Sequence, residues 1–180
     1  VTYSDEVVRR LASMSTAADD FRIFWDNAYV VHDLDPDGNT DEVPSLLRLA
    51  EENGNEDMVY MFASTSKVTF PTAGLAAVAC SKTNWDDLKK AFSFQNIGPD
   101  KVNQMRHVLF FRDLAGVKAH MKKQAAIIRP KFEAVLNALS TELSESGVAS
   151  WTKPKGGYFI SLDVMEGGAK RVEELCFLNF

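Results

Sequence analysis

The ten residues MVYMFASTSK, positions 58–67, decide how the rest of the chain is interpreted. Residues 58–62 are apolar and rich in side chains that favour β-strands. The segment then runs directly into a polar end that carries Ser64, Ser66 and Lys67. In open α/β sheets, ligands bind at the carboxyl ends of the strands. The stretch therefore predicts a strand that brings two hydroxyls and an amine to a ligand site.

A second strand with a polar end is expected upstream, over residues 21–25 (FRIFW). It ends at Asp26, and Tyr29 follows three residues later. A helix should precede this strand, because Ser4 is a good N-cap and apolar residues on one helical face follow it. Helices that alternate with strands are typical of the α/β class, and an α/β fold is the prediction.

The segments after Tyr29 continue the alternation. Pro44 suits the first turn of a helix that ends near Gly54, and residues 75–80 read as a third strand. Asn84 and Asp100 are candidate N-caps of the two helices that should follow.

The final third is expected to contain a long amphipathic helix over residues 117–143, kinked at Pro130. A strand over residues 158–162 and a last helix should follow it. A domain boundary is expected inside the long helix, near residues 116–130.

The composition is that of a globular, soluble protein, with 46% hydrophobic and 25% charged residues. The net charge of −5 argues against a nucleic-acid partner bound through bulk charge. No apolar run reaches the ~20 residues of a membrane span. Cys80 and Cys176 form neither a disulfide framework nor a zinc site, and His32, His107 and His120 lack the spacing of metal ligands. We therefore expect no bound metal, and we expect the protein to be located in a reducing cytoplasm.

The two ends suggest an internal piece of a longer protein. The chain opens on Val1 rather than methionine, and residues 176–180 form an apolar tail without a cap. We therefore expect further sequence on both sides.

Two groups of side chains could carry chemistry. Ser64 and Ser66 could hold a phosphate, and the Lys67 amine could form a Schiff base with a carbonyl. The Asp26 carboxylate could keep a pyridine nitrogen protonated, and the Tyr29 hydroxyl could donate to a phenolic oxygen. Each group alone is better explained by ordinary structure: a solvated serine-rich loop in the first case, and a strand-end aspartate with a core tyrosine in the second.

Taken together and in this order, Asp-x-x-Tyr and Ser-x-Ser-Lys resemble the cofactor site of fold-type I pyridoxal-phosphate aminotransferases. The likeness covers nearly the whole chain and fails only over about the last five residues. It points to aspartate aminotransferases of the subgroup related to the aminotransferase domains of MocR-type regulators. The segments that carry it are residues 21–34, 62–74, 96–107 and 151–163.

The resemblance implies a role for each candidate residue. Lys67 would bind pyridoxal 5'-phosphate as a Schiff base and then shuttle a proton between Cα of the amino acid and C4′ of the cofactor. Asp26 would pair with the pyridine nitrogen and Tyr29 would hold the phenolic oxygen. Ser64 and Ser66 would contact the phosphate. The phosphate-binding arginine that many relatives place after this lysine is absent from residues 71–75.

The resemblance also implies an architecture and an activity. Residues 1–120 would form part of the large cofactor-binding domain with a mixed, mostly parallel sheet, and residues 121–180 part of the smaller C-terminal α+β domain. The full-length protein would be a homodimer that transfers an amino group between aspartate and 2-oxoglutarate. Two alternatives stay open: a pyridoxal-phosphate-binding sensor domain of a MocR-like regulator, and an inactive fragment.

Two weaker signals favour ordinary structure. The aspartates of residues 33–41 imitate the opening of a calcium loop, but Pro44 stands where a bidentate glutamate is needed, so a solvated acidic loop is expected. Arg106, His107 and Arg112 are expected to be helix-surface charges.

Overall fold

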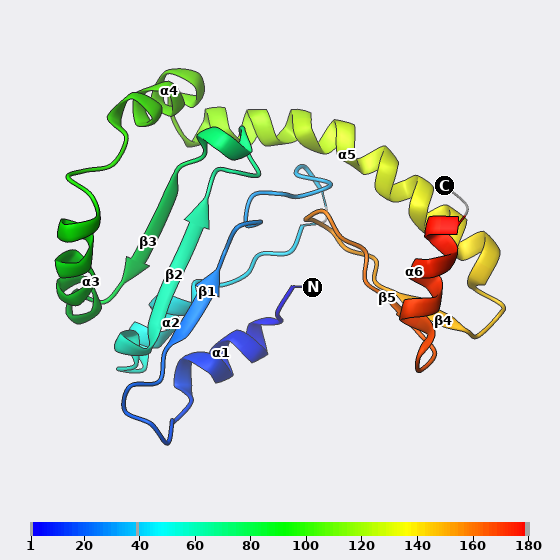
Figure 1. Cartoon of the computed structure of the whole chain (residues 1–180), viewed down its shortest axis with the longest axis horizontal. Coiled ribbons are helices and arrows are strands. Elements are labelled where there is room, and N and C mark those ends of the chain that lie inside the picture. The colour runs from blue at the N-terminus through cyan, green and yellow to red at the C-terminus, as the bar shows by residue number, and fades with distance from the viewer. Residues whose placement is uncertain (1, 39, 179–180) are drawn as a thin grey trace. The chain divides into compact units, whose positions relative to one another are not determined.

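The computed structural model describes residues 2–38 and 40–178 (Figure 1). The chain divides into two compact units. The N-terminal unit contains Thr2–Val31 and Asp41–Met121, and the C-terminal unit contains His32–Thr40 and the chain from Lys122 onward. The division falls inside one long helix, α5 (Leu114–Leu143).

The N-terminal unit is built on a three-stranded sheet with the order β1-β2-β3. Its strands are β1 (Ile23–Asp26), β2 (Val59–Ser64) and β3 (Ala76–Cys80). β1 and β2 are parallel, whereas β2 and β3 are antiparallel. The sheet is therefore mixed, as the resemblance implied.

One face of this sheet is covered by α1 (Asp5–Ser13) and α2 (Leu46–Glu52). Side chains alternate between the faces of a strand, and this decides which residues of β1 are buried. Trp25 is 9% exposed in the core beneath the two helices, whereas its neighbour Phe24 is 71% exposed on the opposite face. The core under the helices consists of Val8, Ala12, Trp25, Leu46, Leu49, Ala50 and Val59.

The helices over this face begin at serine caps. Ser4 Oγ accepts a hydrogen bond from Val7 N, as predicted. The Ser45 hydroxyl caps α2 by accepting a hydrogen bond from Arg48 N. Pro44 therefore lies before the helix, and its predicted place in the first turn is wrong. Gly54 follows the C-terminus of α2 with a φ of +70°, a conformation that favours glycine.

The cap of α3 (Lys82–Gln95) was predicted wrongly. Ser81, not Asn84, accepts the capping hydrogen bond. Asn84 is 3% exposed inside the helix, where its side-chain amide donates to the Asp57 carbonyl at 2.8 Å. A buried long-range partner thus uses the side chain that sequence alone assigned to a local cap.

α4 (Lys101–Phe111) begins at Asp100, whose carboxylate accepts from Asn103 N at 2.9 Å, and this cap is confirmed. α5 runs through Pro130 as one helix, so the proline does not end it. Within the described residues, no helix is both long and apolar enough to cross a bilayer.

The C-terminal unit contains the rest of α5, an antiparallel pair of short strands and a last helix. These elements are β4 (Ala149–Trp151), β5 (Leu162–Val164) and α6 (Gly168–Leu178). Two short 3-10 helices, Glu56–Met58 and Pro71–Ala73, lie in the N-terminal unit.

The predicted strand at residues 158–162 is wrong for all but its last residue. The segment before it turns at Gly157, whose φ is +79° and whose N–H donates to the His32 carbonyl at 2.8 Å. The Lys155 carbonyl accepts from Leu34 N at 2.8 Å. These long-range bonds hold the residues just before the predicted strand, and β5 begins only at Leu162.

We predict that Leu46→Ala lowers the free energy of unfolding by about 2–5 kcal/mol, because it empties a fully buried position of the core. Urea unfolding measures this loss. Leu114→Ala, at a side chain that is 64% exposed, is the matched control and should change stability by less than about 0.5 kcal/mol. Equal losses in both variants would contradict this assignment of the core.

Candidate active site

The carboxyl ends of β1 and β2 lie side by side because the two strands are parallel. Asp26, the last residue of β1, is in register with Phe62, and Asn27 N donates to the Phe62 carbonyl at 2.8 Å. Ser64 lies two residues beyond Phe62 and so on the same face of β2. The strand pairing thus brings the Asp26 segment and the segment of Ser64 to one edge of the sheet.

Asp26 also shapes the turn that carries Tyr29. Its Oδ1 accepts from Ala28 N at 3.2 Å, and Val30 N donates to the Asn27 carbonyl at 3.4 Å. Tyr29 lies in this turn, with its side chain 36% exposed. One carboxylate therefore ends the strand and orders the residues that position the tyrosine.

Ser64 organises the turn that contains Lys67. The Ser64 hydroxyl accepts from Ser66 N at 3.1 Å and donates to Ser66 Oγ at 2.9 Å. This pattern resembles the local turns that serine side chains stabilise. Both serines are half-buried, whereas Lys67 is exposed immediately after them.

The segment after Lys67 closes back onto the start of β3. Thr65 N donates to the Leu75 carbonyl at 2.8 Å, and Leu75 N donates to Thr65 Oγ1 at 2.7 Å. Gly74 fits tightly beneath Ser66. A Cβ atom on Gly74 would lie 2.4 Å from Ser66 Oγ and 2.9 Å from the Ser66 amide nitrogen, closer than atoms can approach.

Residues outside the predicted cofactor site also hold this segment. His107 was expected to be a helix-surface charge, and this is wrong: it is half-buried, and its Nε2 lies 3.0 Å from Thr65 Oγ1. Asn103, one turn earlier on α4, donates to the Ala73 carbonyl at 2.9 Å. Their spacing of four residues puts Asn103 and His107 on one helix face, the signal that could have found them.

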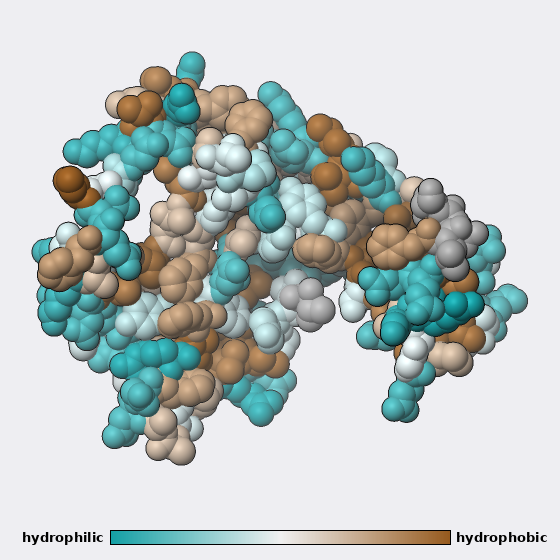
Figure 2. All heavy atoms as spheres, in the orientation of Figure 1, coloured by the Kyte–Doolittle hydropathy of each residue, from teal (hydrophilic) through white to brown (hydrophobic). Residues whose placement is uncertain are grey.

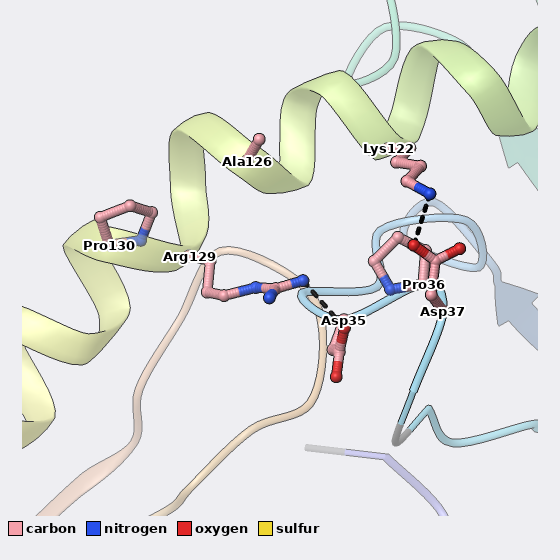
Figure 3. Close-up of a pocket in the computed structure, with 7 residues that line it drawn as sticks. All are labelled: Asp35, Pro36, Asp37, Lys122, Ala126, Arg129 and Pro130. Atoms are coloured by element: carbon pink, nitrogen blue, oxygen red, sulfur yellow. Dashed lines mark hydrogen bonds and ion pairs between the residues drawn. The ribbon is translucent and has the colours of Figure 1, made fainter.

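The acidic loop of the C-terminal unit is tied to α5 (Figure 3). Asp35 pairs with Arg129 at 2.9 Å, and Asp37 pairs with Lys122 at 2.5 Å. The paired side chains are exposed, and such exposed pairs each contribute no more than about 1 kcal/mol. Among the described residues, no group of three or more potential ligands could hold a metal ion.

Three side chains in the described part of the chain have pKa values that are shifted from their ordinary values. Burial raises the pKa of the Cys80 thiol, which disfavours the reactive thiolate. On the exposed surface of α3, a hydrogen bond from Lys82 lowers the pKa of Asp86, and one to Asp87 raises the pKa of Lys90. The shifts of Asp86 and Lys90 belong to ordinary ion pairs on a helix surface.

Comparison with known proteins gives a consistent result over almost the whole chain. The model of the family described as "Aspartate amino-transferase" matches residues 1–177. The aspartate aminotransferase of Corynebacterium glutamicum is 47% identical over 177 residues, which are 97% of this chain and 40% of that protein. The chain therefore spans about two fifths of the length of the curated relatives it matches.

Solved structures show the same relationship. A crystal structure of an aspartate transaminase from Corynebacterium glutamicum superposes with a TM-score of 0.92 at 46% identity, covering 98% of this chain and 41% of that one. The α-aminoadipate aminotransferase LysN of Thermus thermophilus, complexed with N-(5'-phosphopyridoxyl)-L-leucine, gives a TM-score of 0.69 at 25% identity, covering 90% and 39%.

We predict that Gly74→Ala destabilises the fold by about 1–3 kcal/mol, because the new methyl group displaces the Ser66 backbone. Hydrogen exchange at the Ser66 amide, which donates to Ser64, should become faster. Gly98→Ala is the control, because nothing lies within 4 Å of the added Cβ. If the two variants behave alike, the close approach of Gly74 to Ser66 has no energetic consequence.

Proposed function

This chain belongs to the aspartate amino-transferase family, and we propose that the protein is a pyridoxal-phosphate-dependent aminotransferase whose cofactor is carried by Lys67. The observation that supports this most directly is the parallel register of β1 and β2. It brings the Asp26 turn and the Ser64–Lys67 turn to one edge of the sheet, where an α/β fold binds its ligands.

The residues at this edge fit the chemistry of the cofactor. Ser66 Oγ accepts the Ser64 hydroxyl, which leaves the Ser66 hydroxyl hydrogen to donate to a phosphate oxygen. Asp26 Oδ1 accepts a hydrogen bond from Ala28 N, and the carboxylate has further lone pairs that can accept from a protonated ring nitrogen. In this proposal Tyr29 donates its hydroxyl hydrogen to the phenolic oxygen.

Lys67 supplies the reactive amine. It follows the serine turn directly and is exposed, so its four-carbon stem can reach a ligand bound over the strand ends. Bound pyridoxal phosphate acts as an electron sink for charge that develops at the substrate α-carbon. Lys67 would hold the cofactor through its amine, and the same amine would accept the α-proton of the substrate as a general base and donate it to C4′ of the cofactor as a general acid.

For the substrates, we propose aspartate and 2-oxoglutarate. The support is the likeness to the Corynebacterium glutamicum protein named aspartate aminotransferase, at 47% identity. Residues 96–107 and 151–163 also favour the subgroup related to MocR-type regulators. The free thiols Cys80 and Cys176 agree with a reducing cytoplasm.

We further propose that the full-length protein is a homodimer. Large apolar side chains gather over α3 and α4 on the face that Figure 2 shows. The exposed ones in this region are Trp85, Phe92, Phe94, Ile97, Val102, Met105, Val108, Leu109 and Phe110. Soluble monomers rarely expose so many apolar side chains in one region, and a second subunit is the cover that we propose.

Trapping with borohydride tests the assignment of Lys67. Incubation of the full-length protein with pyridoxal phosphate, reduction and peptide mass mapping should give one labelled peptide, which contains Lys67. Lys67→Ala should lose the label and lower kcat for transamination by at least about 10²–10⁴-fold, the contribution of a general acid–base group. Lys118→Ala, at an exposed lysine of α5, is the matched control and should keep both.

Two outcomes would change the conclusion. Labels scattered over many lysines would mean that Lys67 holds no cofactor. A single label on Lys67 without transamination of aspartate or other amino acids would instead favour a sensor domain.

The dimer is tested by light scattering on the full-length protein. Leu109→Asp places a charge on a side chain that is 71% exposed in the apolar region and should shift the dimer towards the monomer mass. Ala134→Asp, at an exposed position of α5 in the C-terminal unit, should not. A Leu109→Asp protein that stays fully dimeric would place the subunit contact elsewhere.

A further inference from the structure

The lysine loop, residues 65–75, connects β2 to β3 and carries Lys67. Its two ends are joined by the hydrogen bonds between Thr65 and Leu75. Several further anchors come from α4 and from the part of α5 that belongs to the same unit. The loop is therefore fixed by side chains that follow it in sequence by tens of residues.

Thr65 and His107 form the centre of this anchoring. His107 Nδ1 lies 2.9 Å from the Asn103 carbonyl, which can only accept, so Nδ1 carries the hydrogen. In the neutral ring Nε2 is then an acceptor, and Thr65 Oγ1 lies 3.0 Å from it. The Thr65 hydroxyl oxygen accepts from Leu75 N, and its hydrogen is donated to Nε2. Both ring nitrogens of His107 and the hydroxyl group of Thr65 are thus hydrogen-bonded.

The same face of α4 reaches two more points of the loop. Thr69 Oγ1 donates its single hydrogen to the Thr65 carbonyl at 3.1 Å, so it has none left for His107 Nε2, which lies 3.3 Å away. The Asn103 side-chain amide donates to the carbonyls of Ala73 and Gly74 at 2.9 and 3.3 Å. α4 thus holds the start of the loop through His107 and its end through Asn103.

The residue directly after Lys67 is also fixed. Val68 is 5% exposed and packs with Phe111 and Met121, and its carbonyl accepts from His120 Nε2 at 2.8 Å. On the other side of Lys67, Ser66 is bonded to Ser64. The Lys67 side chain is exposed while both of its neighbours in sequence are held, which is the arrangement that an amine aimed at a ligand requires.

We propose that Thr65 and His107 are positioning residues for the chemistry at Lys67: their hydrogen bond holds the lysine loop in the conformation that aims Nζ. This inference rests on the proposed function. Neither side chain needs to touch a substrate, because each acts through the backbone of the loop. A displacement of about 1 Å at a reacting group can cost about 10²-fold in rate, so the loss of this bond should be measurable.

Paired variants of the full-length enzyme test the proposal. Thr65→Val keeps the shape of the side chain but loses both the acceptor for Leu75 and the donor to His107, whereas Thr65→Ser keeps both. We expect Thr65→Val to lower kcat by about 10–10²-fold with little change in KM, and Thr65→Ser to restore most of it. Thr83→Val, at an exposed threonine of α3, is the matched control.

Variants of His107 test the other partner. His107→Gln can place an amide oxygen where Nε2 accepts, whereas His107→Leu cannot accept at all. Gln should therefore retain more of kcat than Leu. Thermal unfolding identifies any His107 variant that fails to fold. In that case the comparison of Thr65→Val with Thr65→Ser tests the positioning role.

Hydrogen exchange on the cofactor-free protein gives a readout that is independent of activity. The Leu75 amide should exchange faster in Thr65→Val and His107→Leu than in the unmodified protein or Thr83→Val, because its acceptor is lost or loosened. Unchanged exchange, or equal kcat values for Thr65→Val and Thr65→Ser, would overturn the proposal. Faster exchange with an unchanged kcat would also overturn it, since the bond would then be structural only.

A failure of the proposed function can be distinguished from a failure of the positioning role. If the unmodified protein shows no borohydride label on Lys67, the cofactor assignment is wrong and the positioning role falls with it. The exchange rates at Leu75 would still report whether the Thr65–His107 bond forms.

Discussion

The parallel pairing of β1 with β2 is the constraint on which the candidate site depends. It sets Asp26 beside Phe62, two residues before Ser64, and so fixes which polar residues can meet. A slip of the register by one residue would turn the side chains of one strand to the other face and separate the carboxylate from the serines. The burial of Trp25 beneath α1 and α2 opposes that slip, because it would expose a large apolar side chain.

The lysine loop shows how a short polar segment is held without regular secondary structure. Its backbone groups are satisfied by Thr65, by Asn103 on α4 and by His120 on α5. Gly74 permits the tight approach to Ser66 because it has no Cβ. The order of the loop therefore depends on α4 and α5, which follow it in sequence. A substitution in α4 can change the conformation of the loop at Lys67.

The two faces of the sheet differ in a way that bears on function. The face beneath α1 and α2 is a packed core. On the opposite face, the exposed ring of Phe24 contacts Tyr60 and Phe62 edge-on, with ring centroids 5.5 Å apart in both pairs. Asp26 and Ser64 share this face with the aromatic side chains. A flat ligand placed there would meet aromatic carbon below and polar groups at the strand ends.

The sequence alone determined the α/β class, the three strands of the first sheet and the order of polar residues at their ends. These follow from local composition, since short apolar segments that end in Asp26 or Ser64 need no distant partner to be recognised. Only the tertiary structure decided the roles of Asn84 and His107, which pair with Asp57 and Thr65 far along the chain. The same holds for Gly157, whose N–H donates to the His32 carbonyl at a turn just before the strand expected at residues 158–162. A side chain or backbone group that can form either a local or a distant hydrogen bond carries no sign of the choice in its own sequence, because packing settles it.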